Sequence, residues 1–304
     1  MELKHVLSKT WDFIEYLLLL LLILLIRLLS WNSAIVLAKN LSKFTSKIIT
    51  KRYLISVDNI EKGLKISNSE ARKIADKVWE NMGQLMAEFI KCAHYNKKQL
   101  LQRTELVGKE KIEKHLAEGK GALIHAGHFT NWEVMGLTIS ANGIDKAAIA
   151  KRTSNRFVDK KIISMREHFG GKILYNRNPF FSCVKALKQG KAIGILMDQS
   201  VSHGSVFAPF MGRMAATSSL TALLSLKLQI PVFPVKVIRK DGKIISEILD
   251  PIQPIGSYTQ KNMMKTITTL NSYYETWIKE DPTSWFWLHN RWKREHEAKK
   301  YEKN

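Results

Sequence analysis

One short segment, residues 121–133, constrains the fold of this chain more than any other. An apolar run at residues 122–124, of the kind that forms a buried strand, passes through a turn of small residues to His128. Asn131 can cap a helix that begins at Trp132. Open α/β sheets are built from such strand-to-helix units, and they bind ligands beyond the carboxyl ends of the strands. We therefore expect His128 to lie at a strand end of this kind.

Glu133 follows His128 by five residues. On one continuous helix this separation would turn the two side chains apart by about 140°. Across a strand-to-helix turn they can meet, and a carboxylate beside an imidazole fixes one tautomer and stabilises the imidazolium. The pair therefore predicts a general base. The competing interpretation is a packed histidine with a glutamate favoured by the helix dipole, and the spacing alone leaves both open.

Apolar periodicity predicts alternating helices and strands through the rest of the chain. We expect helices over residues 68–93, 108–118, 156–169, 180–188 and 218–228, and strands over residues 122–124, 146–151, 172–175, 192–197, 231–238 and 243–249. This alternation predicts an α/β fold with a mostly parallel sheet flanked by helices. The turn dipeptide Asp241-Gly242 favours a hairpin between the last two strands, so the sheet is expected to be mixed.

The N-terminal segment is strongly apolar, with an unbroken run of leucine and isoleucine after Tyr16 that extends to Ile26. Counted from Trp11, the segment is about long enough to cross the hydrocarbon core of a bilayer. No small-residue cleavage site follows the run, which favours an uncleaved membrane-anchoring helix over a signal peptide. We expect residues 1–32 to form this membrane anchor and residues 33–304 to form the main domain.

Basic residues flank the apolar run unequally. Two lysines precede it, and five basic residues follow it: Lys39, Lys43, Lys47, Lys51 and Arg52. The positive-inside rule then predicts that the main domain faces the cytosol. Residues 33–49 have a loose apolar face, which suits either a helix on an anionic membrane or an ordinary packed helix. Whether the apolar segment spans the membrane or lies in its interface stays open.

The chain is strongly basic, with 48 Lys and Arg against 27 Asp and Glu and a net charge of +21. An excess of this size implies a polyanionic partner such as nucleic acid, an anionic membrane, an acidic protein or a phosphorylated lipid. The two cysteines, Cys92 and Cys183, lie far apart and provide neither a disulfide framework nor the spacing of metal ligands.

Three further candidate site residues lie near predicted strand ends or helix starts. Arg152 follows one predicted strand, Asp198 follows another, and Arg213 closes an aromatic loop before a helix. A guanidinium at such a position can hold a phosphate. Near the C-terminus, residues 285–293 interleave tryptophans with basic residues, a pattern that suits either nucleic-acid stacking or a membrane interface.

In their order along the chain, these motifs resemble the late acyltransferases of lipid A biosynthesis. The blocks are the apolar N-terminus, His-Phe-Thr-Asn-Trp-Glu at 128–133, Arg152 with Asn155, Asp-Gln at 198–199, Pro-Phe-Met-Gly at 209–212, Pro-Val-Phe-Pro-Val at 231–235, and Trp-Phe-Trp-Leu-His-Asn-Arg-Trp-Lys at 285–293. Many members of that family have a second acid two residues after the Asp of Asp-Gln, where this chain has Ser200.

The resemblance implies that residues 33–304 form an acyltransferase domain. It would transfer a fatty acyl chain from an acyl carrier protein thioester to a hydroxyl of a Kdo-bearing lipid A precursor. His128 would be the general base and Glu133 its orienting acid, with backbone N–H groups of residues 130–132 stabilising the oxyanion. The acceptor site would be lined by Arg152, Asn155, Asp198 and Arg213.

The same resemblance implies that no metal and no cofactor take part beyond the thioester co-substrate, and that nucleic acid is not a partner. The expected location is the inner membrane of a Gram-negative bacterium, with the catalytic domain facing the cytoplasm. Two alternatives stay open. The first is an acyltransferase for another glycolipid or a lysophospholipid, and the second is a non-catalytic, membrane-anchored basic binding protein.

Overall fold

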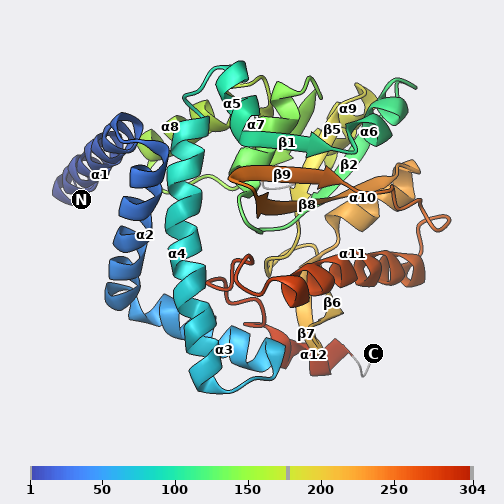
Figure 1. Cartoon of the computed structure of the whole chain (residues 1–304). Helices are drawn as coiled ribbons and strands as arrows, with labels where there is room; N and C mark the ends of the chain where they lie inside the picture. Colours follow the sequence, from blue (N-terminus) through green and yellow to red (C-terminus); the bar gives the residue numbers. More distant parts are fainter. Residues whose placement is uncertain (1, 176–178, 302–304) are drawn as a thin grey trace.

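The computed structural model describes residues 2–175 and 179–301. Four helices come first: α1 (Glu2–Leu28), α2 (Trp31–Ile48), α3 (Thr50–Leu64) and α4 (Asn68–Cys92). Helix α4 begins with a capping box, in which the Ser67 side chain accepts from Glu70 N and the Glu70 carboxylate accepts from Ser67 N. It packs along α2 and α3 and joins the N-terminal helices to the α/β body (Figure 1).

The central sheet has seven strands in the order β1-β9-β8-β2-β5-β3-β4. Their bounds are β1 (Thr104–Val107), β2 (Ala122–Ala126), β3 (Lys146–Ile149), β4 (Lys172–Leu174), β5 (Ala192–Leu196), β8 (Val232–Lys240) and β9 (Lys243–Ile248). All neighbouring pairs are parallel except β8 and β9, which form a hairpin through Asp241 and Gly242. Both turn residues have positive φ, as this turn requires. The prediction of a mixed, mostly parallel sheet is therefore confirmed.

The remaining helices are α5 (Lys97–Arg103), α6 (Lys109–Leu116), α7 (Trp132–Ala141), α8 (Arg156–Arg166), α9 (Pro179–Lys188), α10 (Leu220–Leu228), α11 (Gln260–Glu280) and α12 (Glu295–Tyr301). A small antiparallel pair, β6 (Ser205–Phe210) and β7 (Arg213–Ser218), forms a separate sheet. This pair, strand β1 and helices α3, α5, α11 and α12 are not among the elements expected from the sequence. Strand β1 has only four residues, too few to show a period, whereas α11 does carry a helical spacing of apolar residues, at Met263, Ile267, Leu270, Tyr274 and Ile278.

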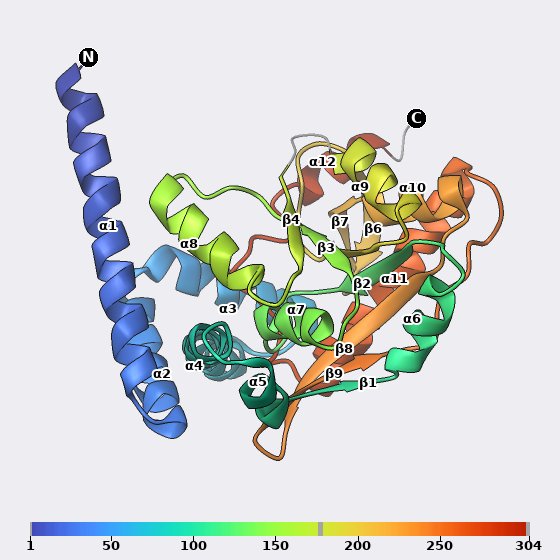
Figure 2. The ribbon, with the colours of Figure 1, turned by 90° about the horizontal axis from the view of Figure 1, so that it is seen from above.

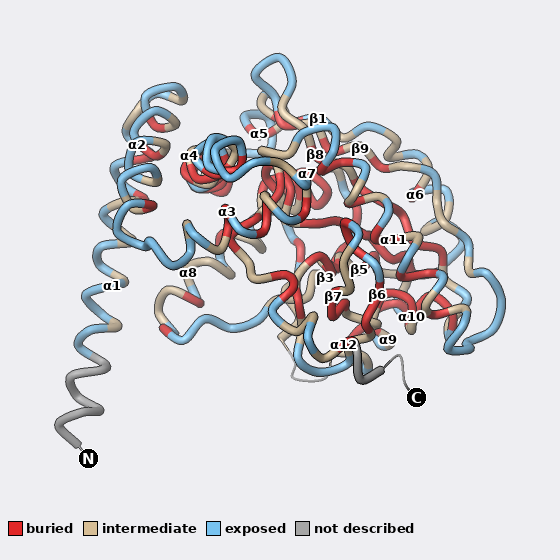
Figure 3. The backbone as a smooth tube through the Cα atoms, turned by 90° about the horizontal axis from the view of Figure 1, so that it is seen from below, coloured by how far each residue is buried: buried red, intermediate tan, exposed pale blue. Residues whose placement is uncertain are grey.

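The core lies on both faces of the sheet, because side chains alternate between the faces along each strand. On β2, Ile124 joins the cluster that packs against α7, whereas Leu123 joins the cluster that includes α10 and α11. Figure 3 shows the buried backbone concentrated in the strands and the inner helices, while much of α1 and α2 is exposed or partly exposed.

Helix α1 lies at the edge of the molecule (Figure 2), where it contacts α4 and α8. Asp12, Glu15 and Arg27 interrupt its apolar sequence. Within residues 2–175 and 179–301, no helix combines the length and the low charge needed to cross a bilayer. The transmembrane anchor expected over residues 1–32 is therefore not supported.

The tryptophans of the tail, residues 285–293, lie in the protein interior. This corrects the expectation that they stack on nucleic acid or lie at a membrane interface. Trp285, Trp287 and Trp292 are at most 5% exposed, and Arg291 is fully buried. Arg291 donates to Ala216 O and to Thr217 Oγ1 and stacks over Phe210. Neither a nucleic acid nor a membrane interface can reach side chains that are covered in this way.

Candidate active site

His128 and Asp198 meet because β2 and β5 are neighbouring parallel strands. Ala126 is paired with Leu196 in the ladder, and His128 and Asp198 each lie two residues beyond this pair. His128 Nδ1 donates to Asp198 Oδ1 at 2.8 Å, and the His128 backbone N–H donates to Asp198 Oδ2 at 2.9 Å. The expected position of His128 at the carboxyl end of a buried strand is confirmed.

The Asp198 carboxylate is held as an anion inside the protein. Its side chain is 1% exposed, and it also accepts from Trp285 Nε1 at 2.7 Å. Burial alone would raise the pKa of Asp198, but the charge of His128, the hydrogen bonds from His128 and the bond from Trp285 lower that pKa to about 2. A carboxylate bound to Nδ1 directs the remaining ring nitrogen, Nε2, away from it. The His128 side chain is 18% exposed.

We predicted a contact between the Glu133 carboxylate and the His128 ring, but the carboxylate has other partners among the described residues. It binds Arg166, with Nε to Oε2 at 2.8 Å and Nη2 to Oε1 at 2.5 Å, and it accepts from Trp132 Nε1 at 3.3 Å. Glu133 lies in the first turn of α7, and Arg166 is the last residue of α8. The helix therefore turns Glu133 toward α8, and the carboxylate that binds the His128 ring is that of Asp198.

Two aromatic side chains flank the His128 ring. Trp132 meets it edge-on with ring centroids 4.8 Å apart, and Phe286 lies 6.0 Å away. Trp132 and Phe286 also contact each other at 5.9 Å. Both rings are partly exposed, so they form an apolar border beside a histidine that solvent can still reach.

A buried polar network, formed with α4 and β8, holds the turn that follows His128. Glu88 of α4 is 2% exposed and accepts from Asn131 Nδ2 at 2.8 Å and from Arg239 at 2.9 and 2.8 Å. Asn131 caps α7 by accepting from Val134 N. Thr130 has a φ of +51°, a strained value for a β-branched residue, and Arg239 donates to its carbonyl oxygen. This network determines where α7 begins.

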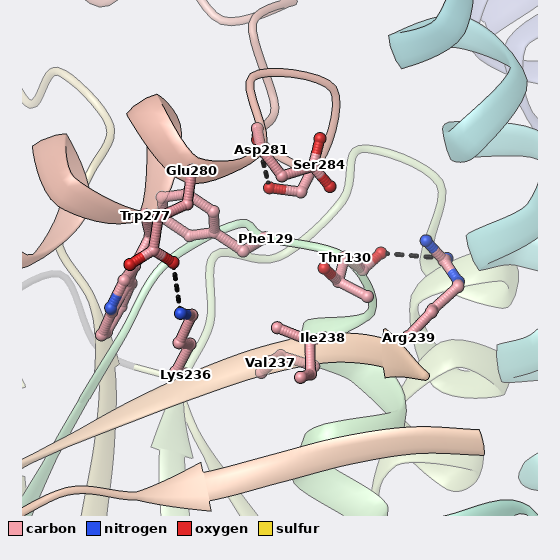
Figure 4. A pocket seen from close by; sticks show the side chains of 10 residues that line it. All are labelled: Phe129, Thr130, Lys236, Val237, Ile238, Arg239, Trp277, Glu280, Asp281 and Ser284. Atoms are coloured by element: carbon pink, nitrogen blue, oxygen red, sulfur yellow. Dashed lines mark hydrogen bonds and ion pairs between the residues drawn. The ribbon is translucent and has the colours of Figure 1, made fainter. Parts of the chain in front are cut away.

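A cavity of about 240 Å³ lies behind this turn, on the side of Thr130 (Figure 4). Phe129 and Thr130 form one wall, the end of β8 forms another, and the segment from Trp277 to Ser284 closes it. Lys236 and Glu280 form an ion pair within it. The His128 side chain does not line this cavity.

The other predicted acceptor-site residues are not gathered around His128. Asn155 is 4% exposed, caps α8, and donates to Asp12 O at 2.7 Å and Glu15 Oε2 at 3.0 Å. It lies at the opposite end of α8 from Arg166, about 16 Å away along a helix of this length. Its side chain holds α1 against the start of α8 through these bonds, and its role in substrate binding stays a prediction.

Arg213 and Arg152 also have other surroundings. Arg213 lies on β7, binds Glu295 at 2.6 Å and stacks on Trp292 at 4.6 Å, so it fastens α12 and the tail and does not line the His128 site. Arg152 is exposed and lies over the Tyr175 ring at 4.9 Å. Its role in binding an acceptor stays a prediction.

Sequence reasoning missed two residues of the site, Arg166 and Trp285. Nothing in the local sequence marks Arg166, because its contact with Glu133 depends on how α8 packs beside α7. Trp285 belongs to the tryptophan-rich motif at residues 285–293. Its backbone bridge to Phe129 and its hydrogen bond to Asp198 join segments far apart in the chain, so the motif alone does not reveal them. In the part of the chain that the structure describes, no three His, Cys, Asp or Glu side chains cluster as metal ligands would.

Comparison with known proteins identifies the class of this protein and then its family. A protein from Haemophilus influenzae described as a lipid A biosynthesis acyltransferase is 25% identical over 226 residues, covering 73% of this chain and 69% of that protein. A lipid A biosynthesis lauroyltransferase from Escherichia coli is 27% identical over 261 residues, covering 83% of each. The protein is an acyltransferase.

The family follows from the match to a sequence model. The model of the bacterial lipid A biosynthesis acyltransferases matches residues 2–294, and the chain belongs to this family. Its reaction is therefore acyl transfer in lipid A synthesis, and the non-catalytic binding protein is excluded. The solved 1-acyl-sn-glycerophosphate acyltransferase of Thermotoga maritima overlaps with a TM-score of 0.39 at 16% identity, covering 79% of this chain and 97% of that one. That overlap is too low to support any further comparison.

Proposed function

We propose that this acyltransferase moves a fatty acyl chain from an acyl carrier protein thioester to a hydroxyl of a Kdo-bearing lipid A precursor, with His128 as the general base. The observation that carries the proposal is the His128–Asp198 hydrogen bond of 2.8 Å beside a reachable imidazole. A hydroxyl is a weak nucleophile at neutral pH and needs a base as it attacks.

In this mechanism, His128 Nε2 accepts the hydroxyl proton while the oxygen attacks the thioester carbonyl carbon. Asp198 stabilises the imidazolium through Nδ1–H, the role that the sequence analysis gave to Glu133. The tetrahedral intermediate then expels the thiolate, and the imidazolium returns the proton to sulfur. The products are the acylated lipid and the free thiol of the carrier.

The negative oxygen of the intermediate needs hydrogen-bond donors. The N–H of Thr130 is already used, because it donates to Ser284 O at 2.8 Å. Trp132 and Glu133 are the first two residues of α7, and their N–H groups have no acceptor within a helix that begins there. These two groups, at the positive end of α7, are the donors that we assign to the oxyanion.

Glu133 of α7 and Arg166 of α8 form an ion pair that is suited to hold an anionic acceptor. Arg166 is 28% exposed and Glu133 is 12% exposed. By holding the guanidinium with two hydrogen bonds, Glu133 orients its three remaining N–H donors. We assign Arg166, together with the exposed Arg152, to the phosphate or carboxylate groups of the acceptor.

We further propose that α1 and α2 contact the cytoplasmic face of the inner membrane without spanning it. Their exposed large apolar side chains include Trp11, Phe13, Leu17, Leu18, Leu21, Leu24, Leu28, Val36, Leu41, Phe44 and Ile48. A helix pair with such a surface and a lysine-rich sequence suits the interface of an anionic bilayer. The acyl carrier protein, an acidic protein, would meet the basic chain from the aqueous side.

The test is an acyl-transfer assay with purified protein in detergent. A labelled acyl carrier protein thioester and a Kdo-bearing lipid A precursor are supplied, and the mass of the lipid product is measured by mass spectrometry. We expect one acyl mass gain with the native protein, a loss of rate of about 10³-fold or more in His128→Ala, and a normal rate in His168→Ala, whose histidine is exposed. Transfer only to lysophospholipid acceptors would overturn the acceptor, and an active His128→Ala would overturn the base.

A further inference from the structure

The tail segment of residues 284–294 joins the two loops that carry the candidate base and its carboxylate. Its backbone forms two hydrogen bonds with the His128 loop: Ser284 O accepts from Thr130 N at 2.8 Å, and Phe286 N donates to His128 O at 3.0 Å. Its side chains form hydrogen bonds with the Asp198 loop. His289 Nε2 accepts from Ser200 N at 3.0 Å, and Arg294 donates to Val201 O at 2.8 Å.

Within this segment, Trp285 makes the one contact that reaches the carboxylate itself. Its Nε1–H donates to Asp198 Oδ2 at 2.7 Å, while the His128 ring is bound to Oδ1. Oδ2 also accepts from the His128 backbone N–H at 2.9 Å, so three donors hold the two carboxylate oxygens, and the Trp285 bond is the shortest of the three. The Trp285 ring is 2% exposed and packs against Phe129, Phe210, Trp287 and Trp292.

We propose that Trp285 is a positioning residue for acyl transfer, which acts by fixing the Asp198 carboxylate so that its other oxygen keeps the Nδ1 proton of His128. An indole N–H is a donor only, so it bonds to the ionised carboxylate and favours the anion. Without it, Oδ2 keeps only the bond from the His128 backbone N–H, so the carboxylate is held less tightly and orients the imidazole less well. The kinetic part of this inference rests on the proposed function, but the contact does not.

The chain offers a closely matched control in Trp287. It is also buried, contacts the Trp285 ring at 4.6 Å, and donates its Nε1–H at 2.7 Å, but the acceptor is Pro282 O and not a carboxylate. Trp285→Phe and Trp287→Phe therefore remove the same atoms from equally buried sites. Only the first changes the surroundings of Asp198.

The first measurement is proton NMR of the whole protein in detergent, which needs no substrate. The Nδ1–H resonance of His128 is assigned as the downfield signal missing from His128→Asn. We expect it to move or broaden beyond detection in Trp285→Phe and to keep its position in Trp287→Phe. An unchanged resonance in Trp285→Phe, or the same change in both variants, overturns the inference.

If Trp285→Phe does not fold, the same hydrogen bond can be tested by changing its acceptor, Asp198, and observing its donor, the Trp285 indole N–H. Asp198→Asn keeps the shape of the side chain but removes its charge, so the Trp285 indole N–H resonance should move upfield as its hydrogen bond weakens. The Trp287 indole resonance should stay in place. No movement of the Trp285 signal would overturn the inference.

The second measurement is the acyl-transfer rate of folded variants. We expect Trp285→Phe to lower kcat by about tenfold, as the loss of one charge-assisted hydrogen bond allows, with KM changed by less than about twofold. Trp287→Phe should keep kcat within about threefold under conditions where it stays folded. A raised KM with normal kcat would overturn the positioning role. Failure of the native protein to transfer acyl chains would leave the NMR result standing and would count against the proposed function alone.

Discussion

The carboxylate of Glu133 faces Arg166, whose Nε and Nη2 atoms bind its two oxygens at 2.8 and 2.5 Å. The pair ties the first turn of α7 to the last residue of α8, so the residue predicted to orient His128 also holds two neighbouring helices together.

A double-mutant cycle on Glu133→Gln and Arg166→Lys should reveal a coupling of about 1–2 kcal/mol in the free energy of unfolding, because the pair is bidentate and partly buried. Urea unfolding in detergent measures it. The exposed pair of Lys62 and Asp58 is the control, and its coupling should stay below about 0.5 kcal/mol. Strictly additive effects at Glu133 and Arg166 would contradict the pairing.

Asp198→Asn should lower kcat by about 10³-fold or more while the melting temperature changes little, because an amide cannot stabilise the imidazolium and can favour the wrong tautomer. Steady-state acyl transfer measures this loss. The comparison with Glu133→Gln is decisive. If Glu133→Gln lost far more kcat than Asp198→Asn, Glu133 would be the acid that serves the base, as the sequence analysis first proposed.

His125 should make the fold sensitive to mild acid. It is fully buried, donates from Nε2 to Leu270 O, and stacks on Tyr274, and burial lowers its pKa to about 4. An unfolded histidine has a pKa of about 6.5, so the unfolded chain binds the proton first. The stability linked to His125 is present above about pH 6.5 and is lost as the pH falls toward 4, up to about 3 kcal/mol.

Urea unfolding at pH 7 and pH 5 checks this dependence, with His125→Gln as the variant that cannot titrate. We expect the native protein to lose more stability over this interval than the variant. His289, whose pKa burial also lowers to about 4, should leave part of the loss in the variant. Equal losses in both proteins would show that His125 is not the source.

Arg239→Met should destabilise the protein by about 3–5 kcal/mol, because it leaves the buried Glu88 carboxylate without its cation. Adding Glu88→Gln should recover part of the loss, since a neutral amide is less costly to bury unpaired. Thermal unfolding of the two single variants and the double variant measures this. A double variant less stable than Arg239→Met would argue against an ion pair at this place.

Leu21→Gln combined with Leu24→Gln should weaken binding to anionic lipid vesicles by about tenfold or more, since both side chains are largely exposed on α1. Vesicle co-sedimentation measures the partition. Val107→Gln is the control, because Val107 is an exposed apolar residue on β1, on another side of the molecule. Equal binding of the three proteins would mean that α1 does not face the bilayer.

Several parts of the fold and the site were readable from the sequence, because they depend on neighbours along the chain. The apolar run before His128, the cap at Asn131 and the Asp241-Gly242 turn each predict an element that the structure contains. The order of motifs identified the family. These are local signals, set by backbone propensity, capping and the period of apolar residues.

The partners of the side chains were decided only by the tertiary structure. Asp198 reached His128 because β5 lies beside β2, and Glu133 turned to Arg166 because α7 packs beside α8. Asn155 and Arg213 bind acidic residues on α1 and α12, which spacing along the chain could not reveal. The sequence by itself determined the family, six of the seven strands of the central sheet and the position of His128. The carboxylate that binds His128, and the burial of Trp285, depend on which strands and helices become neighbours.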